Sequence, residues 1–92
     1  MAFFVSTTRT ADDQLADLWM QANSRGRRAI NASALRLDSV LARSADTAGI
    51  PYPAGRLPTA RRIDDPPLAV VFVLHVSTRT AVILDYLDSS SP

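Results

Sequence analysis

Arginine supplies all ten basic residues of this 92-residue chain, and most of them lie in its middle. Residues 25–63 carry a formal charge of +6, whereas residues 1–24 and 64–92 carry −2 and −3. Guanidinium groups bind phosphates and carboxylates, so we expect this segment to bind a nucleic acid or an acidic target. The alternative is that most of these arginines form the solvated face of one helix. The binding candidates are Arg25, Arg27, Arg28, Arg61 and Arg62.

Few residues of this sequence could carry proton transfer. His75 is the one histidine, and a lone histidine in an apolar strand is more often a half-buried structural residue than a catalyst. Asp64 and Asp65 precede two prolines, a context more typical of a turn than of paired acid–base carboxylates. The absence of cysteine excludes disulfides and a thiolate nucleophile. We expect no metal and no cofactor.

The apolar pattern predicts the elements that hold these residues. Residues 68–76 and 80–87 are β-branched, apolar runs separated by three polar residues, which indicates an antiparallel hairpin. Residues 2–6 and 59–63 are shorter candidate strands, whereas the composition of residues 44–58 makes regular structure there unlikely. Helical periodicity predicts one helix from Thr10, as the N-cap, to about Ala22, and a second over about 27–43. The predicted order is β-α-α-β-β-β, an α+β fold in which a helical hairpin packs on one face of a small antiparallel sheet.

The same periodicities predict the core. The residues expected to be largely buried are Leu15, Leu18, Trp19, Ile30, Leu37, Leu41, Val70, Phe72 and Leu74. Residues 70–74 are apolar at both parities, and a strand of this kind needs cover on both faces. Two helices can cover only one face, so we expect a partner on the other. The residues expected to bind that partner are Val71, Val73 and Tyr86.

The order and spacing of these elements resemble the RelE/ParE superfamily of toxins from bacterial toxin–antitoxin modules. The matching features run over nearly the whole chain and comprise the opening FFVS, Ala11-x-x-x-Leu15-x-x-Leu18-Trp19, Ala34-x-x-Leu37-Asp38-x-x-Leu41, Arg61-Arg62-Ile63, Pro67 to Phe72 and the final hairpin. The resemblance implies the helix-on-sheet fold named above. It also implies the toxin of a type II, plasmid-stabilising module, with a cognate antitoxin as its partner.

The resemblance also permits a comparison of catalytic positions. RelE-type members cleave mRNA at the ribosome with basic residues on the sheet, and Arg62 corresponds to one of them, so Arg62 joins His75 as a catalytic candidate. The Arg that opens the third strand of that branch corresponds to Ala69, and the later basic pair corresponds to Ser89-Ser90. Most of the nuclease constellation is therefore missing, which favours the ParE-like branch, whose members bind and poison DNA gyrase. A ribosome-dependent endoribonuclease and a non-toxic interaction module remain the alternatives, so the chain is not assigned as an enzyme.

The remaining expectations concern location and assembly. No apolar run approaches the roughly 20 residues of a membrane span, and the first five residues lack the features of a signal peptide. We expect a soluble, cytoplasmic protein with one domain over residues 1–92 and no contact with a membrane. Its expected partners are the antitoxin and either gyrase or the ribosome, and without the antitoxin it is expected to self-associate.

Overall fold

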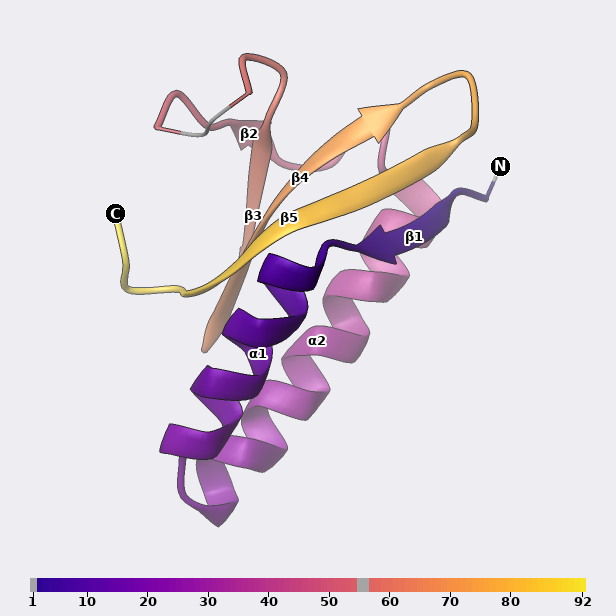
Figure 1. Ribbon diagram of the computed structural model, residues 1–92. Helices are drawn as coiled ribbons and strands as arrows, with labels where there is room; N and C mark the ends of the chain where they lie inside the picture. Colours follow the sequence, from indigo (N-terminus) through magenta and orange to yellow (C-terminus); the bar gives the residue numbers. More distant parts are fainter. Residues whose placement is uncertain (1, 55–56) are drawn as a thin grey trace.

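Two helices cover one face of a five-stranded sheet in the computed structural model, which describes residues 2–54 and 57–92 (Figure 1). The elements are β1 (Phe4–Thr7), α1 (Arg9–Gln21), α2 (Ser24–Ser44), β2 (Ile50–Pro51), β3 (Arg61–Asp65), β4 (Leu68–His75) and β5 (Thr80–Asp88). The strand order is β1-β5-β4-β3-β2. The predicted α+β class is confirmed. Neither helix in the described part of the chain is long and apolar enough to cross a membrane.

The sheet differs from the predicted one in two respects. β1 runs parallel to β5, with Val5 opposite Ala81, whereas the other pairs are antiparallel, so the sheet is mixed. The short strand β2 was not expected in a segment rich in glycine and proline. Gly49 allows it, because this residue has φ 80 and an added Cβ would lie 3.0 Å from the Arg62 carbonyl oxygen.

Each helix begins at a side chain that accepts a hydrogen bond from the first turn. The Thr8 hydroxyl accepts from the amide of Ala11 at 3.1 Å, and the Asn23 side chain accepts from the amide of Gly26 at 2.8 Å. The prediction that Thr10 caps the first helix was wrong by two residues. Ala22 and Asn23 alone separate the two helices, so α1 and α2 form the expected antiparallel hairpin (Figure 1).

The main core lies between the helices and the sheet. Five of the predicted residues are buried there, namely Ile30, Leu37, Leu41, Val70 and Phe72. Three more are partly buried against this core, namely Leu15, Leu18 and Leu74. The prediction for Trp19 was wrong, since this residue is 37% exposed. Its ring stacks against the Arg27 guanidinium rather than against the sheet.

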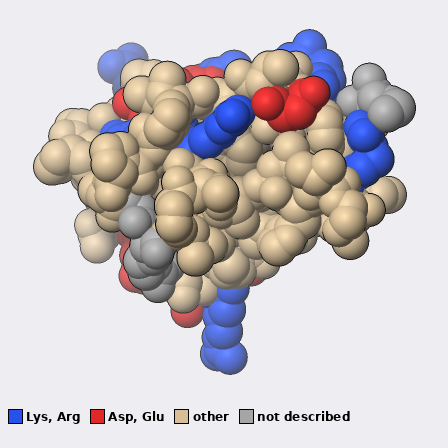
Figure 2. Space-filling model, turned by 90° about the horizontal axis from the view of Figure 1, so that it is seen from above, with Lys and Arg blue, Asp and Glu red and all other residues tan. Residues whose placement is uncertain are grey.

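The opposite face of the sheet has a smaller core of its own. Val71 and Val73 are buried there together with Ala60, under the half-buried ring of Tyr52. The cover over β4 therefore comes from the chain itself, so the inference that only a partner could supply it was wrong. The β5 side chains on this face, including Val82 and Leu84, stay partly exposed. Figure 2 shows that this face, seen from above, is largely uncharged.

The outer edge of β5 is closed beyond β1 by the side chains of Thr8, the N-cap of α1, and of Gln14 in α1. The Thr8 hydroxyl donates to the carbonyl of Leu84 at 3.2 Å. The Gln14 side chain accepts from the amide of Tyr86 at 2.9 Å and donates to the Asp85 carboxylate at 3.0 Å. The Leu84 carbonyl and the Tyr86 amide are therefore not free to pair with a partner strand.

Candidate functional site

Arg62 lies at the centre of the best-connected polar cluster of the described chain. Its Nε donates to Asp64 Oδ1 at 2.7 Å, and its Nη2 donates to the carbonyl oxygens of Ser91 at 2.7 Å and Ser89 at 3.3 Å. The Tyr52 ring centroid lies 5.6 Å from the guanidinium carbon, and the Tyr52 hydroxyl donates to the carbonyl of Pro92 at 3.1 Å. The chain after β5 is therefore held by the side chains of Arg62 and Tyr52. Only 10% of the Arg62 side chain is exposed.

The chemistry available to this cluster is binding rather than proton transfer. The hydrogen bond to Asp64 raises the pKa of Arg62 above its already high ordinary value, so the guanidinium stays charged and cannot act as a base. Ala69, opposite Asp64 in the register, is fully buried and offers neither charge nor space at the position where the nuclease branch has Arg. Ser89 contributes a main-chain carbonyl in place of a cation.

The structure does not bring His75 to Arg62. His75 pairs with Thr80 at the far end of β4, whereas Arg62 pairs with Val71. Four residues of strand separate these positions, which is about 13 Å. His75 is also exposed rather than half-buried as predicted. The two catalytic candidates therefore do not form one site.

Arg61 points to the other face of the sheet from Arg62, as strand alternation requires. Its Nη1 donates to the carbonyls of Asp46 at 3.2 Å and Ala48 at 3.4 Å. These are main-chain groups of the segment that leaves α2. Arg61 therefore fastens that segment to β3, and its predicted contact with a target stays a prediction.

The other three basic candidates lie at the tip of the helical hairpin. Arg27 stacks on Trp19, with 4.1 Å from its guanidinium carbon to the ring centroid, and donates to the carbonyls of Trp19 and Met20. These carbonyls end α1, where a cation is favoured by the helix dipole. Arg25 and Arg28 are exposed at the same tip. The five candidates therefore divide into two separate places, Arg61 and Arg62 on β3 and the remaining three at the tip.

The predicted partner residues are buried inside the chain. Val71, Val73 and Tyr86 are 1%, 6% and 4% exposed, and Tyr86 lies in the core on the helix side. Burial raises the pKa of the Tyr86 phenol to about 12. Partner binding by these residues stays a prediction, and their burial directs attention to apolar side chains that are exposed.

Such side chains occur on the helical hairpin. A groove of about 390 Å³ lies between α1 and α2, with Leu15, Ala16 and Trp19 as its apolar lining. Met20 borders it and is 69% exposed. Sequence reasoning missed this groove because the periodicity of α1 assigned Trp19 to the core, whereas helix–helix packing leaves it at the rim.

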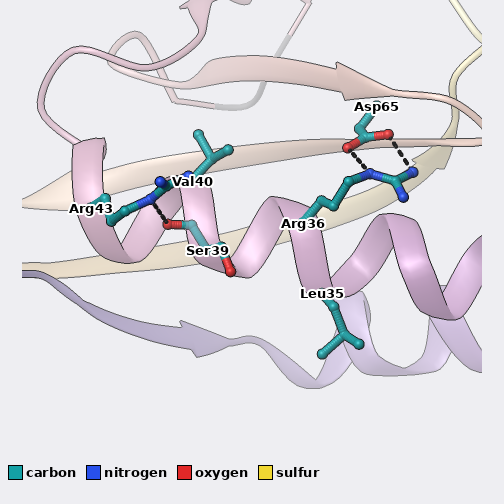
Figure 3. Close-up of a pocket in the computed structure, with 6 residues that line it drawn as sticks. All are labelled: Leu35, Arg36, Ser39, Val40, Arg43 and Asp65. Carbon is teal, nitrogen blue, oxygen red and sulfur yellow. Dashed lines mark hydrogen bonds and ion pairs between the residues drawn. The ribbon is translucent and has the colours of Figure 1, made fainter.

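A second hollow, of about 340 Å³, lies beside α2 and β3 (Figure 3). Arg36 and Asp65 form a two-pronged ion pair there, with both N–O distances at 2.8 Å. This pairing lowers the pKa of Asp65. Figure 3 shows Leu35 pointing away from this pair. Arg43 also lines this hollow and donates to the carbonyl of Ser39 at 3.2 Å. No group of three metal-binding side chains occurs among the residues that the structure describes.

Known proteins match this chain in structure but not in sequence. No family model and no curated protein sequence matches this chain. Among solved structures, a chain of the toxin–antitoxin complex RelBE2 from Mycobacterium tuberculosis aligns with a TM-score of 0.76 at 19% identity, over 99% of this chain and 95% of its own length. A chain of the chromosomal ParDE system from P. aeruginosa aligns with a TM-score of 0.72 at 17% identity, over 95% and 96%. The isolated E. coli RelE toxin aligns with a TM-score of 0.60 at 14% identity, over 99% and 88%.

The chain has the RelE/ParE toxin fold. The alignments span most of the length of each aligned chain, so the likeness covers the helical hairpin and the sheet together. The resemblance read from the order of the sequence elements is thereby confirmed at the level of the fold. The fold does not separate the ParE-like branch from the RelE-like branch.

Proposed function

We propose that this chain is the toxin of a type II toxin–antitoxin module, neutralised by a cognate antitoxin, and that it acts by binding DNA gyrase. The fold it shares with the toxin–antitoxin structures supports the first part. One observation carries the second part. Arg62, the sheet cation that corresponds to a nuclease position, is bound to Asp64 and to main-chain carbonyls, and buried Ala69 stands where that branch has an arginine.

The exposed apolar groove on the helical hairpin supports the antitoxin as a partner. An amphipathic helix can fill such a groove with apolar side chains spaced three and four residues apart. Arg25 and Arg28 at one end of the hairpin would attract acidic residues of that helix. This surface is proposed beside the predicted partner residues Val71, Val73 and Tyr86, which are buried in the chain.

Expression in bacteria tests this proposal. Under an inducible promoter, the chain should arrest growth with filamentation and induction of the SOS response, and co-expression of a cognate antitoxin should prevent both. Purified protein should inhibit gyrase supercoiling. Growth arrest with cut mRNA and no SOS response would contradict gyrase as the target.

The RelE-type endoribonuclease is a second candidate, favoured by the pair of Arg62 and Tyr52. A cation beside an aromatic ring can hold a phosphate and stack on a base. Ribosome-dependent cleavage by the purified chain, lost in Arg62→Gln, would establish this activity. Normal growth on expression would instead favour an interaction module without toxicity.

A further inference from the structure

The outer side of α2 carries a row of exposed side chains that ends in opposite charges. The row consists of Arg28, Asn31, Leu35 and Asp38, and all four are exposed. Spacings of three and four residues place these side chains on one side of the helix. Arg28 and Asp38 are separated by about 15 Å along the helix axis. The row is therefore basic toward the tip of the helical hairpin, apolar near its middle and acidic toward the end of α2.

Side chains beside this row repeat the same polarity. Burial, and then the charges of Asp38 and Asp12, raise the pKa of the Tyr86 phenol, so these two carboxylates lie near the same phenol. Arg27 lies with Arg28 at the tip of the hairpin, against the Trp19 ring. The charge separation along this face thus involves residues of both helices.

The apolar groove of the hairpin lies beside the middle of this row. Asn31 lines it from α2, and Ala16 and Trp19 line it from α1. Leu35 follows Asn31 by one helical turn, is 70% exposed and belongs to neither apolar core. The chain therefore carries an apolar groove and, one turn away, an exposed apolar side chain that could fill the groove of another molecule.

Charge and position together select a second copy of this chain as the occupant. When two such rows lie antiparallel about a two-fold axis, Arg28 of each copy can lie opposite Asp38 of the other. The same register sets Leu35 of each copy opposite Asn31 of the other, which is beside the groove. Desolvation raises the pKa of the Asp38 carboxyl, so a guanidinium from outside would stabilise its charge. With a net charge of +1, two copies repel each other little.

We propose that this face of the hairpin pairs with the same face of a second copy in an antiparallel, two-fold arrangement. Each Leu35 enters the groove of the other copy beside Trp19, and an ion pair between Arg28 and Asp38 forms at each end. Because the surface is no larger than one short helical hairpin, the dimer should dissociate in the micromolar range. A second copy and an antitoxin helix exclude each other from this groove.

The purified full chain provides the first test. Sedimentation velocity should show a monomer becoming a dimer as the protein concentration rises through the micromolar range. Trp19 is the one tryptophan of the chain, and its emission should shift to shorter wavelength over the same range, because Leu35 of the second copy excludes water from the ring. A chain that stays monomeric at millimolar concentration overturns the proposal and leaves the groove to another protein. Dimerisation without a change in Trp19 emission also overturns it, because another surface is then used.

Leu35→Ala tests the apolar contact. Because Leu35 is 70% exposed, circular dichroism should show an unchanged fold. The dissociation constant of the dimer should rise by at least about tenfold, because two leucines lose their apolar contacts. Ile50→Ala is the matched control, since Ile50 is 68% exposed and lies on β2, and it should leave dimerisation unchanged. Equal dimerisation of Leu35→Ala and the native chain would overturn the proposal.

Arg28→Asp and Asp38→Arg test the ion pairs and the antiparallel direction. Each change sets like charges opposite each other at both ends, so either variant alone should remain monomeric. An equimolar mixture of the two variants restores both ion pairs with their signs exchanged and should dimerise, as should a chain that carries both changes. Failure of the mixture and of the doubly changed chain to associate would contradict the proposal, as would dimerisation of either single variant at the native strength. These measurements do not depend on toxicity, so the proposal can fail while the proposed toxin function stands.

Discussion

The two faces of the sheet are covered by different kinds of structure. On the helix side, two capped helices bury a continuous core that includes Leu37, Leu41 and Phe72. On the other side, a largely irregular segment bearing Tyr52 covers a core of Val71, Val73 and Ala60. Helices satisfy their own main-chain groups, whereas an irregular segment cannot. Arginine side chains donate to irregular segments on both sides: Arg61, on the helix side, bonds carbonyls of the segment that leaves α2, and Arg62, on the other side, bonds those of Ser89 and Ser91.

These contacts change the interpretation of the basic segment, residues 25–63. Within this segment Arg27 also donates to a main-chain carbonyl, that of Trp19, and outside it Arg79 donates to the carbonyl of Ala2. A basic stripe that looks in sequence like a nucleic-acid surface is thus used in large part to hold the fold. Of the five binding candidates, Arg25 and Arg28 are the ones left exposed, and both lie at the hairpin tip.

Two neighbouring valines on β4 test whether the covers of the two faces differ in rigidity. Val70 faces the helices and Val71 faces the irregular cover, and both are at most 1% exposed. Val70→Ala should lower the free energy of unfolding by about 2–3 kcal/mol, because the rigid helical side cannot collapse into the cavity. Val71→Ala should cost about 1 kcal/mol less, because the irregular cover can settle. Urea denaturation measures both, and equal losses would show that the two covers are equally rigid.

Alkaline pH should act on the helix side through Tyr86. Its phenol has a pKa of about 12 in the folded state, raised by burial from about 10. A raised pKa stabilises the fold below the unfolded value, and this stability is lost as the pH rises from 10 through 12, by on the order of 2 kcal/mol. Tyr86→Phe should remove this loss in urea titrations at each pH, whereas Tyr52→Phe on the other face should retain it.

Trp19→Ala should have a smaller effect than its size suggests. Because the ring is 37% exposed and contacts Arg27, the loss should be about 1 kcal/mol rather than the 3–5 typical of a buried tryptophan. A fall in the free energy of unfolding above about 3 kcal/mol would place the ring in the core after all. If the helical groove is the docking surface, Trp19→Ala should weaken the binding free energy of the antitoxin by more than it lowers the free energy of unfolding.

The smallest effect should come from the ion pair beside α2. Arg36 lowers the pKa of Asp65, so the pair contributes stability above the ordinary carboxyl pKa of about 4 and loses it as the pH falls through the lower folded value. Arg36 is largely exposed, which keeps the contribution small. The urea midpoints of the native chain and Arg36→Gln should therefore differ slightly at pH 7 and converge near pH 2.

Sequence reasoning predicted the fold better than the site for a physical reason. Periodicity in α2 and β4 reports burial within one element, so Leu37 and Phe72 could be assigned correctly. Tyr52, Ser89 and Ser91 reach Arg62 only through tertiary contacts between segments without periodicity. The same limit applied to Trp19, whose place depends on the second helix, and to Val71, which is covered by Tyr52 and Ala60.

The side-chain closure of the β5 edge has a consequence for how the molecule opens. The amide of Tyr86 is held by Gln14 of α1 rather than by a neighbouring strand. Its hydrogen exchange therefore reports the docking of the first helix, whereas amides bonded between β4 and β5 report separation of the strands. In Gln14→Ala, the Tyr86 amide should exchange faster while β4 remains protected. The Gln14 side chain thus couples the undocking of α1 to the exchange of an amide in β5.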